Sequence, residues 1–367
     1  MNVLLIHNTI PEYRIEFFKF LAKQVQLKIL VTDIGIANSV YGLSFETDES
    51  LDILVIKSLS EIKSVINKNF FDVVVLPPAD TCYQFICSGL AYQCCKKKGI
   101  KVVYWSEKWE ARKIYQPFPK KVKNMIHALM ISFFAKRADL CISAGTMSKQ
   151  YLIKHGVTSE HISIAYDSST SPQVDRYVNI RELYDIPQDA SIVLFLGRLI
   201  ERKGLGVLIR AFYEVLKHES NTYLLIGGTG DIMDYYRKLI SEMHIKNIVF
   251  AGKVEPNERS MYYSQSNVFV LPSYSYKGII EAWGLTVNEA LEQGTPVIAT
   301  DAVGAAYDIA NGRECIMIPE NNTLQLVNSI IMLLSKEKNS VDCKKLYSQY
   351  SVENMAQQFI DALFTLK

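Results

Sequence analysis

The sequence predicts an α/β protein with two Rossmann-like parallel-sheet domains that face each other across a cleft, and three observations lead to this prediction. The chain has 367 residues, which is long for one domain and comfortable for two. Short runs of β-branched and other apolar residues alternate with stretches of helical periodicity. The alternation stops at a polar, proline-containing segment, residues 167–190, and then starts again. Because alternating strands and helices form right-handed βαβ units, each half is expected to form one parallel sheet.

The first half opens with an apolar run, Asn2–His7, that we expect to be a strand. Pro11 then favours the start of a helix, which we expect to continue through Lys23. Helical periodicity returns at Glu61–Asn69 and Gln84–Lys98. The remaining short apolar runs, each expected to be a strand, are Leu27–Thr32, Leu51–Ile56, Asp72–Leu76, Lys101–Trp105 and Leu140–Ser143.

The second half repeats the alternation. Its expected strands are Ile192–Leu196, Tyr223–Gly227, Ile248–Ala251, Val268–Leu271 and Val297–Thr300. Its expected helices are Gly204–Lys217, Asp231–Met243, Glu255–Ser264 and Leu324–Ser335, and an amphipathic pattern predicts a last helix over Val352–Leu366. We therefore expect an N-terminal domain at 1–166, a linker at 167–190, a C-terminal domain at 191–350, and a final helix at 351–367 that packs back on the N-terminal domain.

Composition excludes several classes of protein. The net charge of +2 is close to balance, which argues against a general nucleic-acid-binding protein. The seven cysteines are irregularly spaced and contain no CxxC pair, so we expect a reducing compartment and no zinc site. The first residues, MNVLLIHNT, lack the basic segment and long apolar core of a signal peptide, and no apolar run reaches transmembrane length. We therefore expect a cytoplasmic protein that at most rests on a membrane surface.

The stretch with the most chemical information is Gly278–Gly304. Two carboxylates, Glu281 and Glu289, flank a segment in which a glycine turn is expected to open into a short helix near Leu285. Free backbone N–H groups at a helix N-terminus favour an anion. A carboxylate beside an anion site can also hold the hydroxyl groups of the same ligand. A nucleotide sugar requires this combination.

Two other loops follow predicted strands of the second half. The first carries Arg198 and Lys203, where arginine suits bidentate contact with phosphate and lysine a point-charge contact. Such basic residues are equally common in ordinary solvated loops. The second loop, IGGTGD at residues 226–231, lacks the Gly-x-Gly-x-x-Gly spacing of dinucleotide-binding folds, and no such motif follows the first strand. A nicotinamide-dependent dehydrogenase is therefore disfavoured.

Taken in order, four segments of the second half resemble the donor domain of GT-B glycosyltransferases. They are LGRLIERKGLGVLIRAF, IGGTGD, AGKV and EAWGLTVNEALEQGTPVIATDAVGAAYDI. The resemblance is to the large family of retaining enzymes related to sucrose synthase and bacterial mannosyltransferases. It covers residues 190–312 strongly and extends more weakly through residues 143–164. It implies an acceptor-binding domain at 1–166 and a nucleotide-sugar donor domain at 191–350.

The resemblance also implies roles for individual residues. Arg198 and Lys203 would neutralise the donor diphosphate and so stabilise the leaving group. Glu281 would lie beside the transferred sugar, hold its hydroxyls and stabilise positive charge that develops on the ring. Glu289 would accept hydrogen bonds from the ribose hydroxyls. Glycine turns and the helix N-terminus would cradle the phosphates, through Gly228, Gly284, Leu285 and Thr286.

The first half departs from the family pattern. The usual His-Asp pair is replaced by WSEKWE at residues 105–110, and Glu107 is the best candidate for a polar group on the acceptor side. A surface loop with one ordinary glutamate explains the same residues. His7, Glu12 and Arg14 are further candidates for acceptor contacts. We expect no metal ion and no cofactor besides the nucleotide sugar as co-substrate, because lysine, arginine and the helix dipole can supply the positive charge.

Residues 117–137 combine a basic start, an apolar middle and a basic end. If this segment is helical, one face could lie on an anionic membrane surface, such as the inner face of the plasma membrane. The alternative is an ordinary core-packed helix with charged ends. An enzyme that acts on a lipid-linked acceptor would require a surface that can lie on the membrane.

The leading hypothesis is a retaining hexosyltransferase that moves a sugar from a nucleotide diphospho-sugar, with a UDP-sugar favoured, to a hydroxyl of a glycan or lipid-linked acceptor. Bacterial surface polysaccharide or lipopolysaccharide synthesis is the favoured setting. Two alternatives on the same scaffold are a sugar-nucleotide epimerase or hydrolase and a non-catalytic nucleotide-sugar-binding protein. The lack of suitable histidines argues against the first, and the presence of Arg198, Lys203, Glu281 and Glu289 argues against the second.

Overall fold

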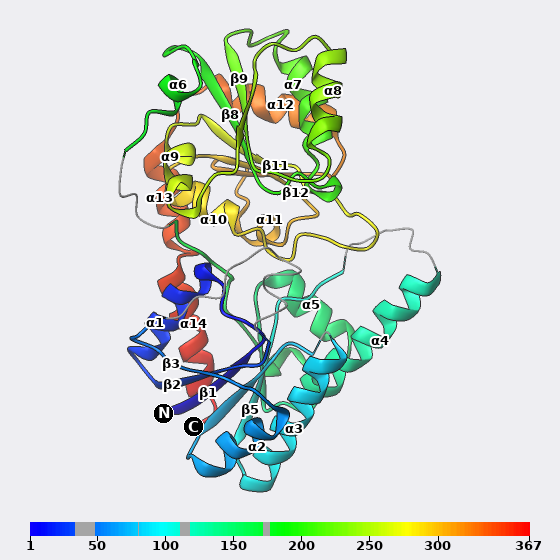
Figure 1. Cartoon of the computed structure of the whole chain (residues 1–367), viewed down its shortest axis with the longest axis vertical. Coiled ribbons are helices and arrows are strands. Elements are labelled where there is room, and N and C mark those ends of the chain that lie inside the picture. The colour runs from blue at the N-terminus through cyan, green and yellow to red at the C-terminus, as the bar shows by residue number, and fades with distance from the viewer. Residues whose placement is uncertain (34–47, 80, 111–117, 172–176) are drawn as a thin grey trace. The chain divides into compact units, whose positions relative to one another are not determined.

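The computed structural model describes residues 1–33, 48–79, 81–110, 118–171 and 177–367, with backbone alone at 118–121. The chain forms two compact units (Figure 1). The first comprises Met1–Trp109, residues 118–167 and Val352–Lys367, and the second is built on Ser168–Ser351. The first unit is therefore completed by the last residues of the chain.

The first unit is built on a seven-stranded sheet with the order β3-β2-β1-β4-β5-β6-β7, in which all neighbouring strands are parallel. Helices α1 and α14 cover one face of this sheet, and α2, α3 and α4 cover the other (Figure 1). The strands are β1 (Asn2–His7), β2 (Gln26–Val31), β3 (Asp52–Val55), β4 (Val73–Leu76), β5 (Lys101–Ser106), β6 (Leu140–Ser143) and β7 (Ile162–Ile164). The helices are α1 (Ile15–Ala22), α2 (Leu59–Lys68), α3 (Cys82–Lys98), α4 (Phe118–Ala135), α5 (Thr146–Lys154) and α14 (Val352–Phe364).

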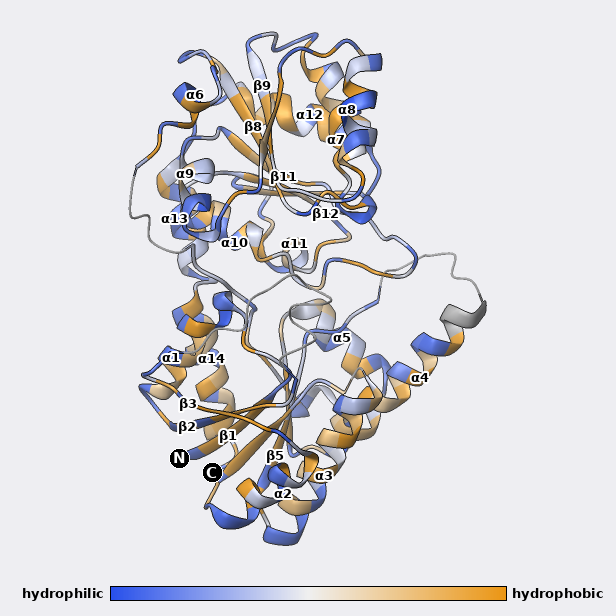
Figure 2. Ribbon diagram, viewed as in Figure 1, coloured by the Kyte–Doolittle hydropathy of each residue, from blue (hydrophilic) through white to orange (hydrophobic). Residues whose placement is uncertain are grey.

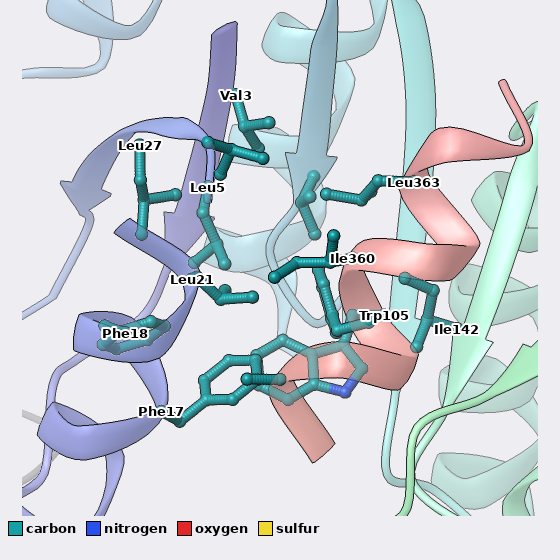
Figure 3. Packing of buried hydrophobic residues seen from close by; sticks show 14 of the residues in the cluster. Val3, Leu5, Phe17, Phe18, Leu21, Leu27, Trp105, Ile142, Ile360 and Leu363 are labelled. Carbon is teal, nitrogen blue, oxygen red and sulfur yellow. The ribbon is translucent and has the colours of Figure 1, made fainter. Parts of the chain in front are cut away.

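The core of the first unit lies between the sheet and the pair α1 and α14. Phe17 of α1 and Phe359 of α14 are fully buried, and their ring centroids are 5.5 Å apart. Trp105 of β5 packs 5.3 Å from the Phe359 ring. Figure 3 shows Ile360 and Leu363 of α14 facing the same cluster. The C-terminal helix therefore closes a core that the N-terminal strands begin.

The second unit has a six-stranded parallel sheet with the order β10-β9-β8-β11-β12-β13. Its strands are β8 (Ser191–Leu196), β9 (Thr222–Gly227), β10 (Ile248–Gly252), β11 (Val268–Leu271), β12 (Val297–Thr300) and β13 (Cys315–Ile318). Its helices are α6 (Ile180–Leu183), α7 (Leu205–Val215), α8 (Met233–Glu242), α9 (Arg259–Ser264), α10 (Thr286–Glu292), α11 (Gly304–Ile309), α12 (Thr323–Leu334) and α13 (Ser340–Ser348), and its 3-10 turns are η4 (Glu201–Lys203) and η5 (Pro256–Glu258).

The second unit also has its own core. Phe212 of α7 and Ile330 of α12 are fully buried against Phe195 of β8 and Val270 of β11. Figure 2 shows the strands of both sheets as hydrophobic and the outward helix faces as largely hydrophilic. Each unit thus has a hydrophobic core of its own, as expected of a folding domain.

The predicted fold class of two parallel α/β sheets is confirmed. The strands predicted at Leu140–Ser143, Val268–Leu271 and Val297–Thr300 have the predicted bounds. The prediction missed β13 and α13: β13 exposes one of its four residues, Met317, and α13 buries only Cys343, so neither has a strong apolar pattern. The helix predicted from Pro11 through Lys23 was wrong at its start, where residues 12–14 form a 3-10 turn before α1.

In the described part of the chain, no helix is both long enough and apolar enough to cross a membrane. All seven cysteines are free.

Candidate functional site

The strand order of the second unit reverses between β8 and β11. Ligands of parallel α/β sheets bind beside the carboxyl ends of the strands at such a switch point. The loop after β8 contains Arg198 and Lys203, and the loop after β11 leads to Glu281. Residues that were predicted to bind phosphate and sugar therefore lie on loops at the same edge of the sheet.

The loop after β8 buries one of its predicted cations and exposes the other. Lys203, at the end of η4, is 9% exposed, whereas the Arg198 side chain is exposed and forms no ion pair with a residue that the structure describes. Gly204 follows with a φ of 73°, and a Cβ atom there would lie 1.9 Å from the Pro272 carbonyl oxygen. Glycine therefore allows the loops after β8 and β11 to touch through their backbones.

The backbone of Glu281 is held against the segment that follows β12. Its N–H donates to the Ala302 carbonyl oxygen, and its carbonyl oxygen accepts from the Gly304 N–H, each at 3.1 Å. These bonds form a short parallel bridge, which sets the direction in which the Glu281 side chain leaves the chain.

The Glu281 carboxylate joins two cations from the loop after β8. Its Oε2 accepts hydrogen bonds from Lys203 Nζ and from Arg202 Nη1, each at 2.7 Å. Burial alone would raise the pKa of Glu281, but Lys203 and Arg202 together lower it to about 2. The group is therefore a carboxylate at neutral pH, and the cluster of three side chains carries one net positive charge.

Arg202 is absent from the residues predicted from the sequence, which paired Arg198 with Lys203. The signal was present in the run Glu-Arg-Lys-Gly, since η4 is a single tight turn that directs Arg202 and Lys203 to the same carboxylate. The missing information was the position of Glu281, which lies 78 residues away from Lys203 in sequence.

The glycine turn after β9 packs on the loop after β8. Gly228 has a φ of 133°, and a Cβ atom there would lie 1.9 Å from the Gly197 carbonyl oxygen. The Leu199 N–H donates to the Thr229 carbonyl oxygen at 2.8 Å. At this turn the backbones of Gly228 and Gly197 are therefore in direct contact, next to Arg198.

Glu289 is buried on α10, with 4% of its surface exposed. Its Oε2 accepts a hydrogen bond from Tyr263 Oη at 2.9 Å, and its Oε1 lies 3.5 Å from Ser169 Oγ and 3.6 Å from Arg259 Nη1. Burial raises the pKa of Glu289, and Arg259 and Tyr263 offset part of this shift. The ribose contact stays a prediction, and it would require this carboxylate to exchange one of its internal partners.

Helix α10 begins at Thr286 with Leu285 as its N-cap, where the sequence predicted a helix start. Gly284 precedes it with a φ of 101°. Thr286 Oγ1 is buried and has no hydrogen-bond partner among the described residues. Buried hydroxyls are normally paired, so the unpaired Thr286 hydroxyl is an exception in the turn that follows Glu281.

The first unit holds a separate polar cluster at the carboxyl ends of its strands. Arg14, just after β1, is 1% exposed. It donates to both carboxylate oxygens of Asp167, with Nη2 to Oδ2 at 3.0 Å, and Nη2 also donates to Glu107 Oε1 at 2.6 Å. The guanidinium is thus buried and bound by side chains of its own unit, and direct contact of Arg14 with an acceptor stays a prediction. Asp167 is a second residue that the sequence did not indicate.

His7 ends β1 beside this cluster. Its Nδ1 lies 2.5 Å from the Thr9 carbonyl oxygen, and its ring centroid lies 5.7 Å from that of Trp105. Burial, with a smaller effect of Arg14, lowers the pKa of His7 to about 4. His7 is therefore neutral at physiological pH, and its contact with an acceptor stays a prediction.

The predicted helix at 117–137 corresponds to α4. One side of it is buried through Ile131 and Phe134. On the other side, four apolar side chains, which we call the α4 apolar face, are 41–62% exposed, at Met125, Ile126, Leu129 and Phe133. The helix thus packs on the unit and leaves these four side chains partly exposed, although the Arg137 guanidinium lies over Phe133, 3.9 Å from its ring centroid.

Comparison with known proteins finds a family match that covers most of the second unit. Residues 178–348 match the family described as Glycosyl transferases group 1. An uncharacterized glycosyltransferase of Methanocaldococcus jannaschii is 29% identical over 190 residues, which cover 50% of this chain and 47% of that protein. The lipopolysaccharide 1,2-N-acetylglucosaminetransferase of Salmonella typhimurium is 26% identical over 194 residues, which cover 49% of this chain and 50% of the relative. The chain thus spans about half the length of these curated relatives.

A solved structure shares the whole architecture. The Anabaena protein HepE, in complex with UDP, superposes on this chain with a TM-score of 0.76 at 15% identity, and 100% of each chain is covered. At this identity the likeness concerns the fold.

Proposed function

We propose that this chain, whose residues 178–348 match the glycosyl transferases group 1 family and whose fold is GT-B, is a retaining hexosyltransferase with a UDP-sugar as donor. The observation that carries the proposal is the cluster of Lys203, Arg202 and Glu281 at the switch point of the second unit. The net positive charge of this cluster would attract a diphosphate, and its carboxylate could accept hydrogen bonds from sugar hydroxyls. The choice of UDP rests on HepE, which was solved with that nucleotide.

In the proposed reaction the diphosphate lies against Lys203, Arg202 and the exposed Arg198. As the bond between the anomeric carbon and the diphosphate oxygen breaks, negative charge grows on that oxygen, and the fixed cations lower the barrier. The acceptor hydroxyl oxygen forms the new bond to the same carbon, and its proton leaves with the diphosphate. Backbone N–H groups of Gly228 and of the turn from Gly284 to Thr286 complete the phosphate contacts.

The two glutamates bind different parts of the donor. Glu281 orients the cations before the donor arrives, and on binding it faces the hydroxyls of the transferred sugar. Glu289 accepts hydrogen bonds from the ribose, while Tyr263 and Ser169 keep its side chain in position. The loop geometry of the second unit supports the role of Glu281.

We propose a glycan or lipid-linked acceptor from surface polysaccharide or lipopolysaccharide synthesis, and a cytoplasmic enzyme at the inner membrane surface. The name of the Salmonella relative, lipopolysaccharide 1,2-N-acetylglucosaminetransferase, supports an acceptor of this class. The α4 apolar face, flanked by the exposed side chains of Lys123 and Arg137, has the composition of a surface that rests on anionic lipid.

A thermal-shift screen tests the donor proposal. UDP, UDP-glucose, GDP-mannose and dTDP-glucose are compared with uridine, which lacks phosphate. A ligand at about 100 times its Kd stabilises the folded state by about 2.7 kcal/mol, so UDP and UDP-glucose should raise the Tm by several degrees. Uridine should raise it much less. If none of the nucleotides raises the Tm, the donor site is wrongly assigned.

A further inference from the structure

Arg14 is held by two carboxylates in unequal ways. Asp167 binds the guanidinium through both oxygens, and both side chains are 2% exposed. Glu107 binds through Oε1 alone, at 2.6 Å, and its side chain is 40% exposed. A single bidentate carboxylate already neutralises a buried arginine. Glu107 is therefore an additional negative group, and neutralisation of Arg14 does not require it.

The free oxygen of Glu107 lies where a ligand is expected. Glu107 directly follows β5, and the strand order of the first unit reverses between β1 and β4, with β5 next to β4. Glu107 Oε2 forms no hydrogen bond with any residue that the structure describes. The cluster of Arg14, Asp167 and Glu107 carries one net negative charge, which favours a hydrogen-bond donor such as a hydroxyl over an anion.

The guanidinium has little freedom to move. Its central carbon lies 5.1 Å from the ring centroids of both Trp105 and Tyr13, and Nη1 lies 3.8 Å from Met355 Sδ of α14. Since Asp167 and these rings fix Arg14, Arg14 in turn fixes one oxygen of Glu107. Preorganised donors and acceptors of this kind are more effective than mobile ones.

We propose that Arg14 is a positioning residue, which Asp167 anchors and which holds Glu107 so that its free oxygen accepts a hydrogen bond from the acceptor hydroxyl. The inference rests on the proposed glycosyl transfer and adds to it the group that orients the acceptor. In this arrangement Glu107 touches the substrate, and Arg14 and Asp167 act only through Glu107.

A double-mutant cycle on the full-length protein tests this role. The variants are Arg14→Lys, Glu107→Gln and the two together, and the assay is transfer from UDP-glucose to a panel of p-nitrophenyl glycosides. Each single variant should lower kcat/KM for the acceptor about 10- to 100-fold, as expected for loss of a hydrogen bond to a charged group. Binding of UDP, measured by calorimetry, should change by less than about twofold because the nucleotide site is in the other unit.

The double variant separates positioning from a merely structural role. If Arg14 acts through Glu107, the double variant should be no worse than Glu107→Gln. The inference would be overturned if the double variant lost the product of the two single-variant losses in kcat/KM. It would also be overturned if Arg14→Lys kept the wild-type kcat/KM. If Arg14→Lys does not fold, Asp167→Asn takes its place in the cycle with Glu107→Gln. Gln84→Leu is the stability control, because it removes a buried hydrogen bond to Thr32 in the same unit and should lower the Tm without changing kcat/KM.

Failure of the proposed function itself has a different signature. In that case the wild-type protein would bind neither UDP nor UDP-glucose, and both proposals would fall before any variant is compared. Binding and transfer by the wild type, together with additive effects of Arg14→Lys and Glu107→Gln, would overturn the positioning role alone.

Discussion

At the scale of single residues, one carboxylate oxygen links the loops that follow β8 and β11. Glu281 Oε2 accepts from Lys203 and from Arg202, so the removal of either cation leaves the other to hold the carboxylate. The two cations are therefore partly redundant for stability, but each would supply its own contact to a bound diphosphate. Variants of Lys203 can for this reason separate catalysis from folding.

Lys203→Ala should abolish most turnover while the fold stays intact. The loss of a positioned charge opposite a developing negative charge costs about 100- to 1000-fold in kcat. Steady-state transfer and circular dichroism of the same preparation measure the two properties. Lys217→Ala, at an exposed lysine near the end of α7, is the control and should keep full activity. Wild-type rates in Lys203→Ala would refute the diphosphate role.

Glu281→Gln should lower stability at neutral pH and less so in acid. The folded pKa of about 2 lies below the ordinary value of 4.5, so the carboxylate contributes stability above pH 4.5 and loses it as the pH falls toward 2. This pKa difference corresponds to roughly 3 kcal/mol, and about half of it should remain at pH 3. Urea unfolding of both proteins at pH 7 and pH 3 measures the change.

The matched control for this pH dependence is Glu337→Gln, at an exposed glutamate of the same unit. It should leave stability unchanged at both pH values. A stability difference for Glu281→Gln that is as large at pH 3 as at pH 7 would mean that its charge is not the cause.

Residues also mark the limit of what a single sequence can predict. Lys203 and Glu281 were predicted because each lies in a local pattern, a basic turn and a glycine-framed helix start. Arg202 and Asp167 were not, since each acquires its partner only when segments distant in sequence meet. Arg14 was predicted only as a candidate for acceptor contact, since its local sequence does not reveal its partners Asp167 and Met355, which lie far along the chain.

At the scale of elements, the glycine turns can be tested with a matched pair of substitutions. Gly228 and Gly252 both have positive φ angles, but a Cβ atom would meet the Gly197 carbonyl at 1.9 Å in the first case and nothing within 4 Å in the second. Gly252→Ala should therefore cost only about 1–2 kcal/mol of backbone strain, and Gly228→Ala distinctly more. Urea unfolding of the two variants compares them, and equal losses would contradict the close approach of the loops.

Helix α4 leads to a prediction about membranes. Flotation with phosphatidylglycerol vesicles at low salt should carry the wild-type protein, and Leu129→Glu should reduce its recovery because a charge enters the α4 apolar face. Val341→Glu places the same charge at another exposed apolar residue, on α13, and should float like the wild type. If the wild-type protein does not float, α4 has no role in lipid binding.

Element boundaries were predictable where the apolar pattern is continuous and bounded by turns, as in β6, β11 and β12. They were not predictable where an element depends on its neighbours. Strand β13 pairs only with β12 at the edge of its sheet, and α13 packs on α10 while burying a single side chain. Such elements owe their structure to tertiary contacts more than to their own sequence.

At the scale of the whole molecule, two cores on one chain should respond separately to core mutations. Phe359 of α14 and Phe212 of α7 are both fully buried, the first in the core of the first unit and the second in that of the second. Replacing a buried phenylalanine with alanine costs about 3–5 kcal/mol. Phe359→Ala should therefore speed amide hydrogen exchange in β1–β6, although the residue lies near the end of the chain, and leave β8–β12 protected. Phe212→Ala should have the opposite pattern, and UDP should slow exchange only in the second unit. If either substitution speeds exchange equally in both sheets, the two units unfold as one.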